Sequence, residues 1–109
     1  MKIAIVGSRT VKAIDLERYV SENDEIITGG AKGADACAAE YARKKGLKLT
    51  VILPEYDRYG RGAPIVRNRQ IVDLADKVVA FWDTRSRGTQ YVIEYAKKMG
   101  KPCEIIVCE

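Results

Sequence analysis

The feature that most constrains the fold is a regular alternation of short apolar runs with stretches of helical pattern. Five apolar runs of buried-strand type are present, at residues 2–6, 25–28, 49–53, 77–82 and 104–108. Stretches with helical spacing or composition lie between them, at residues 13–22, 34–45, 64–75 and 88–99. This alternation predicts an α/β fold, in which a parallel sheet is covered by helices on both faces.

The chain is short enough to form one domain. Its 109 residues contain no linker, repeat or low-complexity tract, so residues 1–109 are predicted to be a single domain. Right-handed crossovers predict a Rossmann-like, doubly wound, five-stranded parallel sheet with strand order 3-2-1-4-5. Such sheets bind ligands beyond the carboxyl ends of their strands, where the winding reverses between the first and fourth strands. Residues 54–63 are expected to form a polar loop.

Two glycine-bearing turns follow strands and precede helical stretches. They are Gly7-Ser8-Arg9-Thr10 and Thr28-Gly29-Gly30-Ala31-Lys32-Gly33-Ala34-Asp35. A strand that turns through glycine into a helix leaves backbone N–H groups and the positive end of the helix dipole facing one spot, which favours an anion. The second turn, at Gly29-Gly30-Ala31-Lys32-Gly33, lacks the order of a dinucleotide fingerprint and of a P-loop. Tight turning and close helix–sheet packing are the alternative explanation for each glycine.

The arginines and lysines separate along the predicted fold. Most arginines fall in loops after strands or in the first turn of the next helix, namely Arg9, Arg58, Arg61, Arg67, Arg85 and Arg87. Most lysines fall at the opposite edge, with Lys32 as the exception. Arginine presents a planar fork of donors that fits phosphate or carboxylate, so this distribution favours an anion site. A chance grouping, or pairing with nearby carboxylates, is the alternative.

Other polar residues are placed near the same edge. Asp35 falls in the first turn of a helix, where a carboxylate interacts well with the dipole; it could instead accept a hydrogen bond from a ribose hydroxyl. Arg67 and Asn68 follow Pro64 closely and can reach the crevice, or they belong to a solvated face. Thr89, in the turn Ser86-Arg87-Gly88-Thr89, is either a ligand residue or only a helix cap.

Support for catalysis is weak in this sequence. The chain has no histidine, which excludes Ser-His and Cys-His nucleophile pairs, and no cysteine–carboxylate cluster has the spacing of a zinc site. The weak candidates for a catalytic carboxylate are Asp83 and Glu94. No metal and no cofactor are expected.

The three cysteines and the hydropathy pattern indicate the cellular compartment in which the protein is expected. The cysteines are odd in number and lack C-x-x-C spacing, so reduced thiols are predicted. No apolar run reaches the roughly 20 residues of a membrane span, and no signal-peptide pattern is present. A cytoplasmic protein without a membrane partner is expected. The net charge of +4 gives a mild bias toward anionic partners.

Taken together, these motifs resemble a known group. The segments Ile5-Val6-Gly7-Ser8-Arg9, 28–35, Arg67-Asn68-Arg69 and Phe81-Trp82-Asp83, leading into 86–89, are similar in order to the YspA-type, YpsA-related branch of the SLOG superfamily. That superfamily is Rossmann-like and includes the LOG phosphoribohydrolases and the DprA/Smf proteins, which bind single-stranded DNA. The resemblance implies a nucleotide-related ligand held by Gly7, Ser8, Arg9, Gly29, Gly30, Gly33, Gly88 and Thr89.

The chain departs from the LOG enzymes at one position. Those enzymes carry P-G-G-x-G-T-x-x-E with a catalytic glutamate, whereas here Val92 stands three residues after Thr89. Glu94 is five residues after Thr89 and points about half a helical turn away from the expected direction. The resemblance therefore implies ligand binding more directly than it implies hydrolysis.

The sequence as a whole predicts binding of a nucleotide or nucleotide-derived ligand, similar to ribose phosphate or ADP-ribose, in a role that would suit a sensor. Arg9, Arg67 and Arg87 would neutralise its phosphate, Lys32 and Asn68 would assist, and Tyr56 or Tyr59 would cover the base. Phosphoribohydrolase cleavage of nucleoside monophosphates is one alternative, and single-stranded DNA binding, ranked lower, is another. The apolar faces of the helices at 64–75 and 88–99 could support a homo-oligomer.

Overall fold

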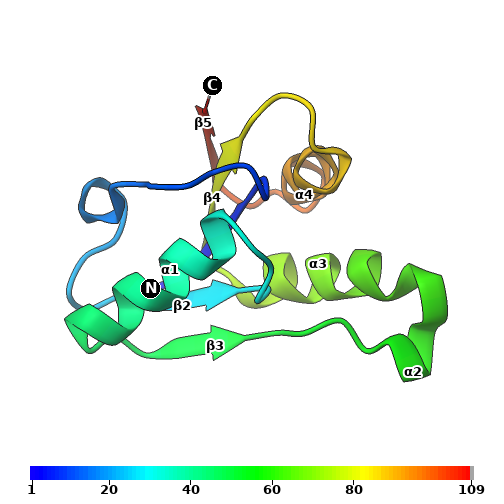
Figure 1. Cartoon of the computed structure of the whole chain (residues 1–109), viewed down its shortest axis with the longest axis horizontal. Coiled ribbons are helices and arrows are strands. Elements are labelled where there is room, and N and C mark those ends of the chain that lie inside the picture. Colours follow the sequence, from blue (N-terminus) through cyan, green and yellow to red (C-terminus); the bar gives the residue numbers. More distant parts are fainter. Residues whose placement is uncertain (109) are drawn as a thin grey trace.

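The computed structural model describes residues 1–108 and contains one five-stranded sheet. The strands are β1 (Lys2–Gly7), β2 (Glu25–Thr28), β3 (Leu49–Val51), β4 (Lys77–Trp82) and β5 (Cys103–Val107). Their spatial order is β3-β2-β1-β4-β5, and every neighbouring pair is parallel (Figure 1). The predicted α/β class and strand order are therefore confirmed.

Helices cover both faces of this sheet. The longer ones are α1 (Ala34–Lys45), α3 (Ala63–Leu74) and α4 (Arg87–Lys98); the short ones are α2 (Tyr56–Tyr59) and the 3₁₀ turns η1 (Leu16–Arg18) and η2 (Gly60–Gly62). Helix α1 packs on one face, while α3 and α4 lie together on the other (Figure 1). None of the helices in residues 1–108 is long and apolar enough to cross a membrane.

The core has two halves because successive strand residues point to opposite faces. Ile3, Ile5 and Ile26 pack with the alanines of α1, whereas Ala4 and Val6 pack with α3 and α4. The strands are buried on both faces, which is why they appear in the sequence as continuous apolar runs. The register of β1 on β4 places Gly7 beside Phe81, at the carboxyl ends of both strands.

The predicted helix at residues 13–22 is wrong. Only η1 forms there, because polar side chains bond to the local backbone and stabilise turns instead. The carboxylate of Asp15 accepts a hydrogen bond from Glu17 N at 3.1 Å, and that of Asp24 accepts one from Ser21 N at 2.8 Å.

The segment between β3 and α3 also differs from the expectation. The predicted polar loop at 54–63 contains α2 and η2, which continue into α3. Strand β3 ends at Val51 rather than 53, because its partner β2 ends at Thr28, opposite Val51. The last backbone bond of this pair runs from Ile52 N to Thr28 O.

The ends of α1 and α4 show which helix signals were interpreted correctly. Gly46 adopts the left-handed conformation with φ of 66°, as expected for a residue just past a helix end. Helix α4 begins earlier than predicted, at Arg87, because its cap is Ser86 and not Thr89. Ser86 Oγ accepts a hydrogen bond from Thr89 N at 3.2 Å.

The predicted apolar faces of the third and fourth helical stretches are used within the chain. Ile71, Val72, Val92, Ile93 and Ala96 are buried against the sheet. These five side chains are therefore engaged within the fold, and the homo-oligomer stays a prediction.

Candidate functional site

A cavity of about 370 Å³ lies beyond the carboxyl end of β1. Its walls come from the loops after β1 and β4, the turn after β2, and the amino-terminal parts of α1, α3 and α4. This is the point where the winding of the sheet reverses between β1 and β4 (Figure 1), the place at which such folds generally bind ligands.

The cavity gathers about half of the residues predicted to form the site. It is lined by Val6, Gly7, Arg9, Thr10, Ala31, Asp35, Pro64, Arg67, Asn68, Ile71, Asp83, Ser86, Gly88, Thr89 and Val92. The predicted residues outside this lining are Ser8, Gly29, Gly30, Lys32, Gly33, Arg87 and Glu94. The lining thus contains two cations, Arg9 and Arg67, and two carboxylates, Asp35 and Asp83, so the site is polar but not uniformly basic.

Ser8 has a structural position instead of facing the cavity. It is 1% exposed, its N–H donates to Phe81 O at 2.9 Å, and its Oγ accepts from Asp83 N at 3.1 Å. Both bonds join the end of β1 to the end of β4. Its backbone N–H is therefore already engaged within the fold.

Gly7 and Gly33 allow close packing of the two glycine turns. A Cβ on Gly7 would lie 2.5 Å from both Ala34 Cβ and Phe81 O. Gly33 has φ of 80°, and a Cβ there would meet the backbone of Ser8 and Arg9. The turn after β1 and the turn before α1 therefore pack directly on each other, and for these two glycines the close-packing explanation applies.

The amino termini of α1 and α4 differ in how their N–H groups are satisfied. Helix α1 begins after Gly33 without a side-chain cap, whereas Ser86 caps α4. A Cβ on Gly88 would meet nothing within 4 Å, so the space over the first turn of α4 is open. The cavity therefore offers a ligand a close approach to this positive helix end.

Arg67 and Asp35 lie on either side of Gly29. The Arg67 guanidinium donates from Nη1 to Gly29 O at 2.6 Å and from Nε to Asn68 Oδ1 at 2.8 Å. A Cβ on Gly29 would lie 2.7 Å from Arg67 Nη1 and 2.9 Å from Asp35 Oδ2. Gly29 does not line the cavity. Because it has no side chain, no Cβ comes between these two groups.

Asp35 is the only charged residue that is buried in the described part of the chain, with 6% exposure. Burial raises the pKa of its carboxyl group, while the N–H of Ala31 and the charge of Arg67 act in the opposite direction. The N–H of Ala31 donates to Asp35 Oδ2 at 3.1 Å. A buried carboxylate with a raised pKa inside a cavity is typical of functional sites.

Asp83 organises the loop after β4. Its Oδ1 accepts from Arg85 N and Ser86 N, each at 2.8 Å, and its Oδ2 accepts from Thr10 Oγ1 at 2.8 Å. These bonds lower its pKa to about 2, so the carboxylate is a weak base with most of its acceptor capacity in use.

Glu94, the other candidate carboxylate, is not brought to the cavity. It is exposed on α4 and accepts a hydrogen bond of 3.3 Å from Gln90. Val92 lines the cavity at the position where the LOG pattern has glutamate.

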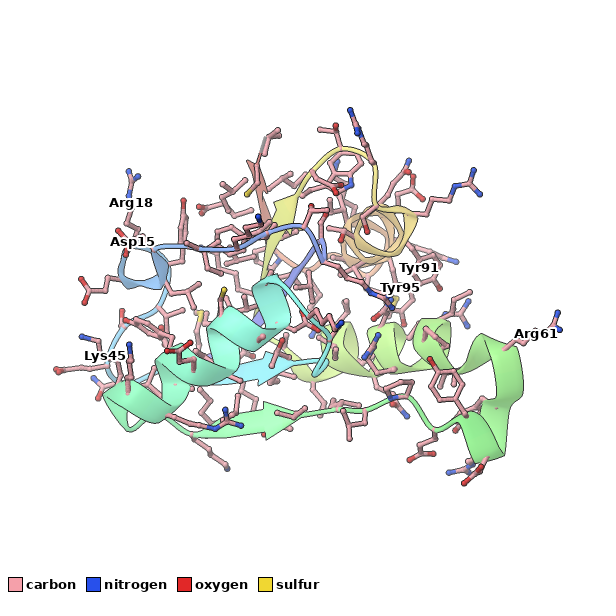
Figure 2. All side chains as sticks on the ribbon, viewed as in Figure 1. Asp15, Arg18, Lys45, Arg61, Tyr91 and Tyr95 are labelled. Carbon is pink, nitrogen blue, oxygen red and sulfur yellow. The ribbon has the colours of Figure 1, made fainter. Side chains whose placement is uncertain are left out.

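The basic residues converge less than the sequence suggested. Arg9 and Arg67 line the cavity, but Lys32 and Arg87 are exposed outside it. Arg61 extends into solvent at the end of the molecule formed by α2 and η2, whereas Arg18 lies near the opposite end (Figure 2). Tyr56 and Tyr59 are on α2, outside the cavity lining, and Arg58 stacks on Tyr59 at 5.3 Å.

Some lining residues were not singled out from the sequence. Thr10 and Ser86 belong to turns that were identified from the sequence as candidate ligand sites. Their position next to the predicted residues was the signal that could have found them. Pro64 was interpreted only as a helix start, Val6 only as part of a buried strand, and Ile71 was not singled out. An apolar residue at the edge of the core looks the same in sequence whether or not a cavity opens beside it.

Possible metal ligands and cysteine thiols are two further chemical features of the described residues, 1–108. No group of three or more cysteine, aspartate or glutamate side chains in residues 1–108 is placed to hold a metal ion. Cys37, Cys103 and Cys108 are free thiols. Burial raises the pKa of the Cys103 and Cys108 thiols.

Comparison with known proteins gives one match. The model of the YspA, cpYpsA-related SLOG family matches residues 1–59, which is more than half of the chain. The matched part holds both glycine turns, together with Arg9 and Asp35. No curated protein and no solved structure gives a significant match.

Proposed function

The chain belongs to the YspA, cpYpsA-related SLOG family, and from this premise we propose that it binds a nucleotide or nucleotide-derived ligand in the cavity at the carboxyl end of β1. Membership of this family suggests a nucleotide-related function. The observation that carries the proposal is the cavity itself, which places Arg9, Arg67 and the open first turn of α4 at the switch point of a doubly wound sheet.

The cations have separate roles in this proposal. Arg9 is exposed and lines the cavity, so its guanidinium could meet a phosphate, assisted by the backbone N–H groups near Gly88. Arg67 is held in place by Gly29 and Asn68, so its position is fixed before the ligand arrives. A ligand that carries phosphate at one end and hydroxyl groups at the other matches this arrangement. Ribose phosphates, nucleotides and ADP-ribose-like molecules share that chemistry.

The two alternatives gain no specific support. A phosphoribohydrolase needs a carboxylate that can accept or donate a proton, and the two carboxylates nominated from the sequence do not meet this need, because Glu94 is outside the cavity and Asp83 is engaged by three donors. A path for single-stranded DNA needs cations and aromatic rings along one groove, whereas Tyr56 on α2 and Arg61 on η2 are both outside the cavity lining.

Calorimetric titration tests the proposal. The protein is titrated with AMP, ADP-ribose and ribose 5-phosphate, and the titrations are repeated with Arg9→Ala and with the control Arg18→Ala, which changes an exposed arginine outside the cavity. Saturable binding should weaken about tenfold or more in Arg9→Ala and stay unchanged in the control. Absence of binding to all three compounds, or equal loss in both variants, would refute the proposal.

A further inference from the structure

The buried end of the cavity contains one acceptor and one donor that face each other across a glycine. Asp35 Oδ2 and Arg67 Nη1 both lie within 3 Å of the position that a Cβ on Gly29 would take. Their separation therefore cannot exceed the sum of the two distances, 2.9 and 2.7 Å. No ion pair within 4.0 Å joins them in the part of the chain that the structure describes.

This spacing suits one particular kind of group. Both residues line the cavity and Gly29 does not, so an oxygen atom on the cavity side of the two groups can make hydrogen bonds of ordinary length, about 2.8 Å, to both. To satisfy both it must donate to a carboxylate and accept from a guanidinium, and a hydroxyl does both at one atom. A phosphate oxygen accepts from Arg67 but is repelled by Asp35, so the charged end of a ligand is directed away from this point.

We propose that Asp35 and Arg67 together bind a hydroxyl group of the ligand's sugar, and that the site therefore selects ligands that carry this hydroxyl over the corresponding deoxy compounds. This inference rests on the proposed function, because it assumes a phosphorylated sugar in the cavity. Asp35 is 6% exposed and Arg67 is fixed by two hydrogen bonds, so the pair is ordered before the ligand binds. A ligand without the hydroxyl would leave the buried carboxylate without that partner, which a site of this kind penalises.

The burial of Asp35 is consistent with this role. A carboxyl group whose pKa is raised by burial makes the fold less stable when it is ionised, so packing alone does not account for it. The small residue at position 29 serves the same arrangement, because any side chain there would occupy the space between the two groups.

The test compares ligands that differ by one hydroxyl. AMP, 2′-deoxy-AMP and 3′-deoxy-AMP are titrated into the protein, and ribose 5-phosphate is compared with 2-deoxyribose 5-phosphate to separate the sugar from the base. At least one deoxy compound should bind about 10- to 100-fold more weakly than its parent. In Asp35→Asn the ratio of the two affinities should fall to near one, while in the control Asp57→Asn, on the exposed helix α2, it should not change.

Gly29→Ala provides a second variant that keeps both charged groups but fills the space between them. It should also remove the preference for the hydroxyl. Equal binding of parent and deoxy compounds by the unmodified protein would overturn the inference and leave the proposed function standing. A preference that persists in both variants would overturn the assignment to Asp35 and Arg67. Failure of every compound to bind would overturn the proposed function, and this inference with it.

Discussion

Arg67 Nη1 donates a hydrogen bond of 2.6 Å to the carbonyl oxygen of Gly29, and this bond joins α3 to the turn that follows β2. The two residues are 38 positions apart in sequence. The bond brings a cation from one face of the sheet to a turn that leads to the helix on the other face. It therefore fixes the position of the guanidinium beside that turn.

Replacing Arg67 should lower stability as well as ligand binding. In Arg67→Met the Gly29 carbonyl and the Asn68 side chain lose their charged donor, so the free energy of unfolding should fall by about 2 kcal/mol. Urea titration measures it, with an unchanged slope as the sign that the unfolded state is not altered. Arg58→Met, which removes an exposed arginine, should cost at most about 0.5 kcal/mol. Equal losses in the two variants would contradict the role assigned to Arg67.

Gly33 and Gly46 form a matched pair, because both have positive φ but only Gly33 lacks space. Gly46→Ala should cost about 1 kcal/mol for the left-handed conformation alone, since nothing lies within 4 Å of the new Cβ. Gly33→Ala should cost at least about 1 kcal/mol more, because its Cβ meets the backbone of Ser8 and Arg9. Denaturant midpoints of the two variants provide the comparison. Similar midpoints would indicate that the two turns are not in firm contact.

Gly88→Ala should raise stability. The glycine is inside the first turn of α4, a Cβ there meets nothing within 4 Å, and its φ is not positive. Alanine in such a helical position gains about 0.5–1 kcal/mol. Thermal unfolding measures the gain; a lower melting temperature would show that the first turn of α4 needs glycine in the unbound protein.

Asp83 should contribute to acid unfolding. Its folded-state pKa of about 2 lies below the ordinary 3.8, so the stability it provides is complete above about pH 4 and is lost as the pH falls toward 2. Asp83→Asn should therefore be less stable than the unmodified protein at pH 7, and the difference should shrink in that acid window. Melting temperatures of both proteins between pH 2 and pH 7 test this. A constant difference would mean that the carboxylate is not ionised in its hydrogen bonds.

Asp35 should behave in the opposite way. Its folded-state pKa is raised above 3.8, so its ionisation destabilises the fold as the pH rises from that value. The stability of Asp35→Asn relative to the unmodified protein should therefore increase with pH above 3.8 and be constant below it. Urea titrations at several pH values in the acid and neutral range measure this slope. A slope of the opposite sign would place the carboxylate in a favourable ion pair.

The sequence predicted the fold well because its main signals are local. The apolar runs of β1 and β4 and the alanine-rich pattern of α1 depend on neighbouring residues, and the strand order follows from general rules of handedness. The error at residues 13–22 arose because hydrophobic spacing was weighed without the backbone bonds to Asp15 and Asp24.

The candidate site was less predictable, because it depends on contacts between distant segments. Sequence position placed Arg87 and Lys32 at the correct edge of the sheet, but the direction of a side chain there depends on packing that no local pattern encodes. In the same way, Gly33 stands in a turn typical of anion sites, yet its lack of a side chain accommodates the Ser8 backbone. The juxtaposition of Asp35 and Arg67 required both helices to be in place.

The mutual contact of the two glycine turns has an evolutionary consequence. Position 7 touches residue 34, and position 33 touches residues 8 and 9, so a larger side chain at one position must be accommodated by a shift of the other segment. Substitutions at these positions in related proteins should therefore occur together rather than singly. A deep alignment in which they vary independently would show that the two segments separate in other members of the lineage.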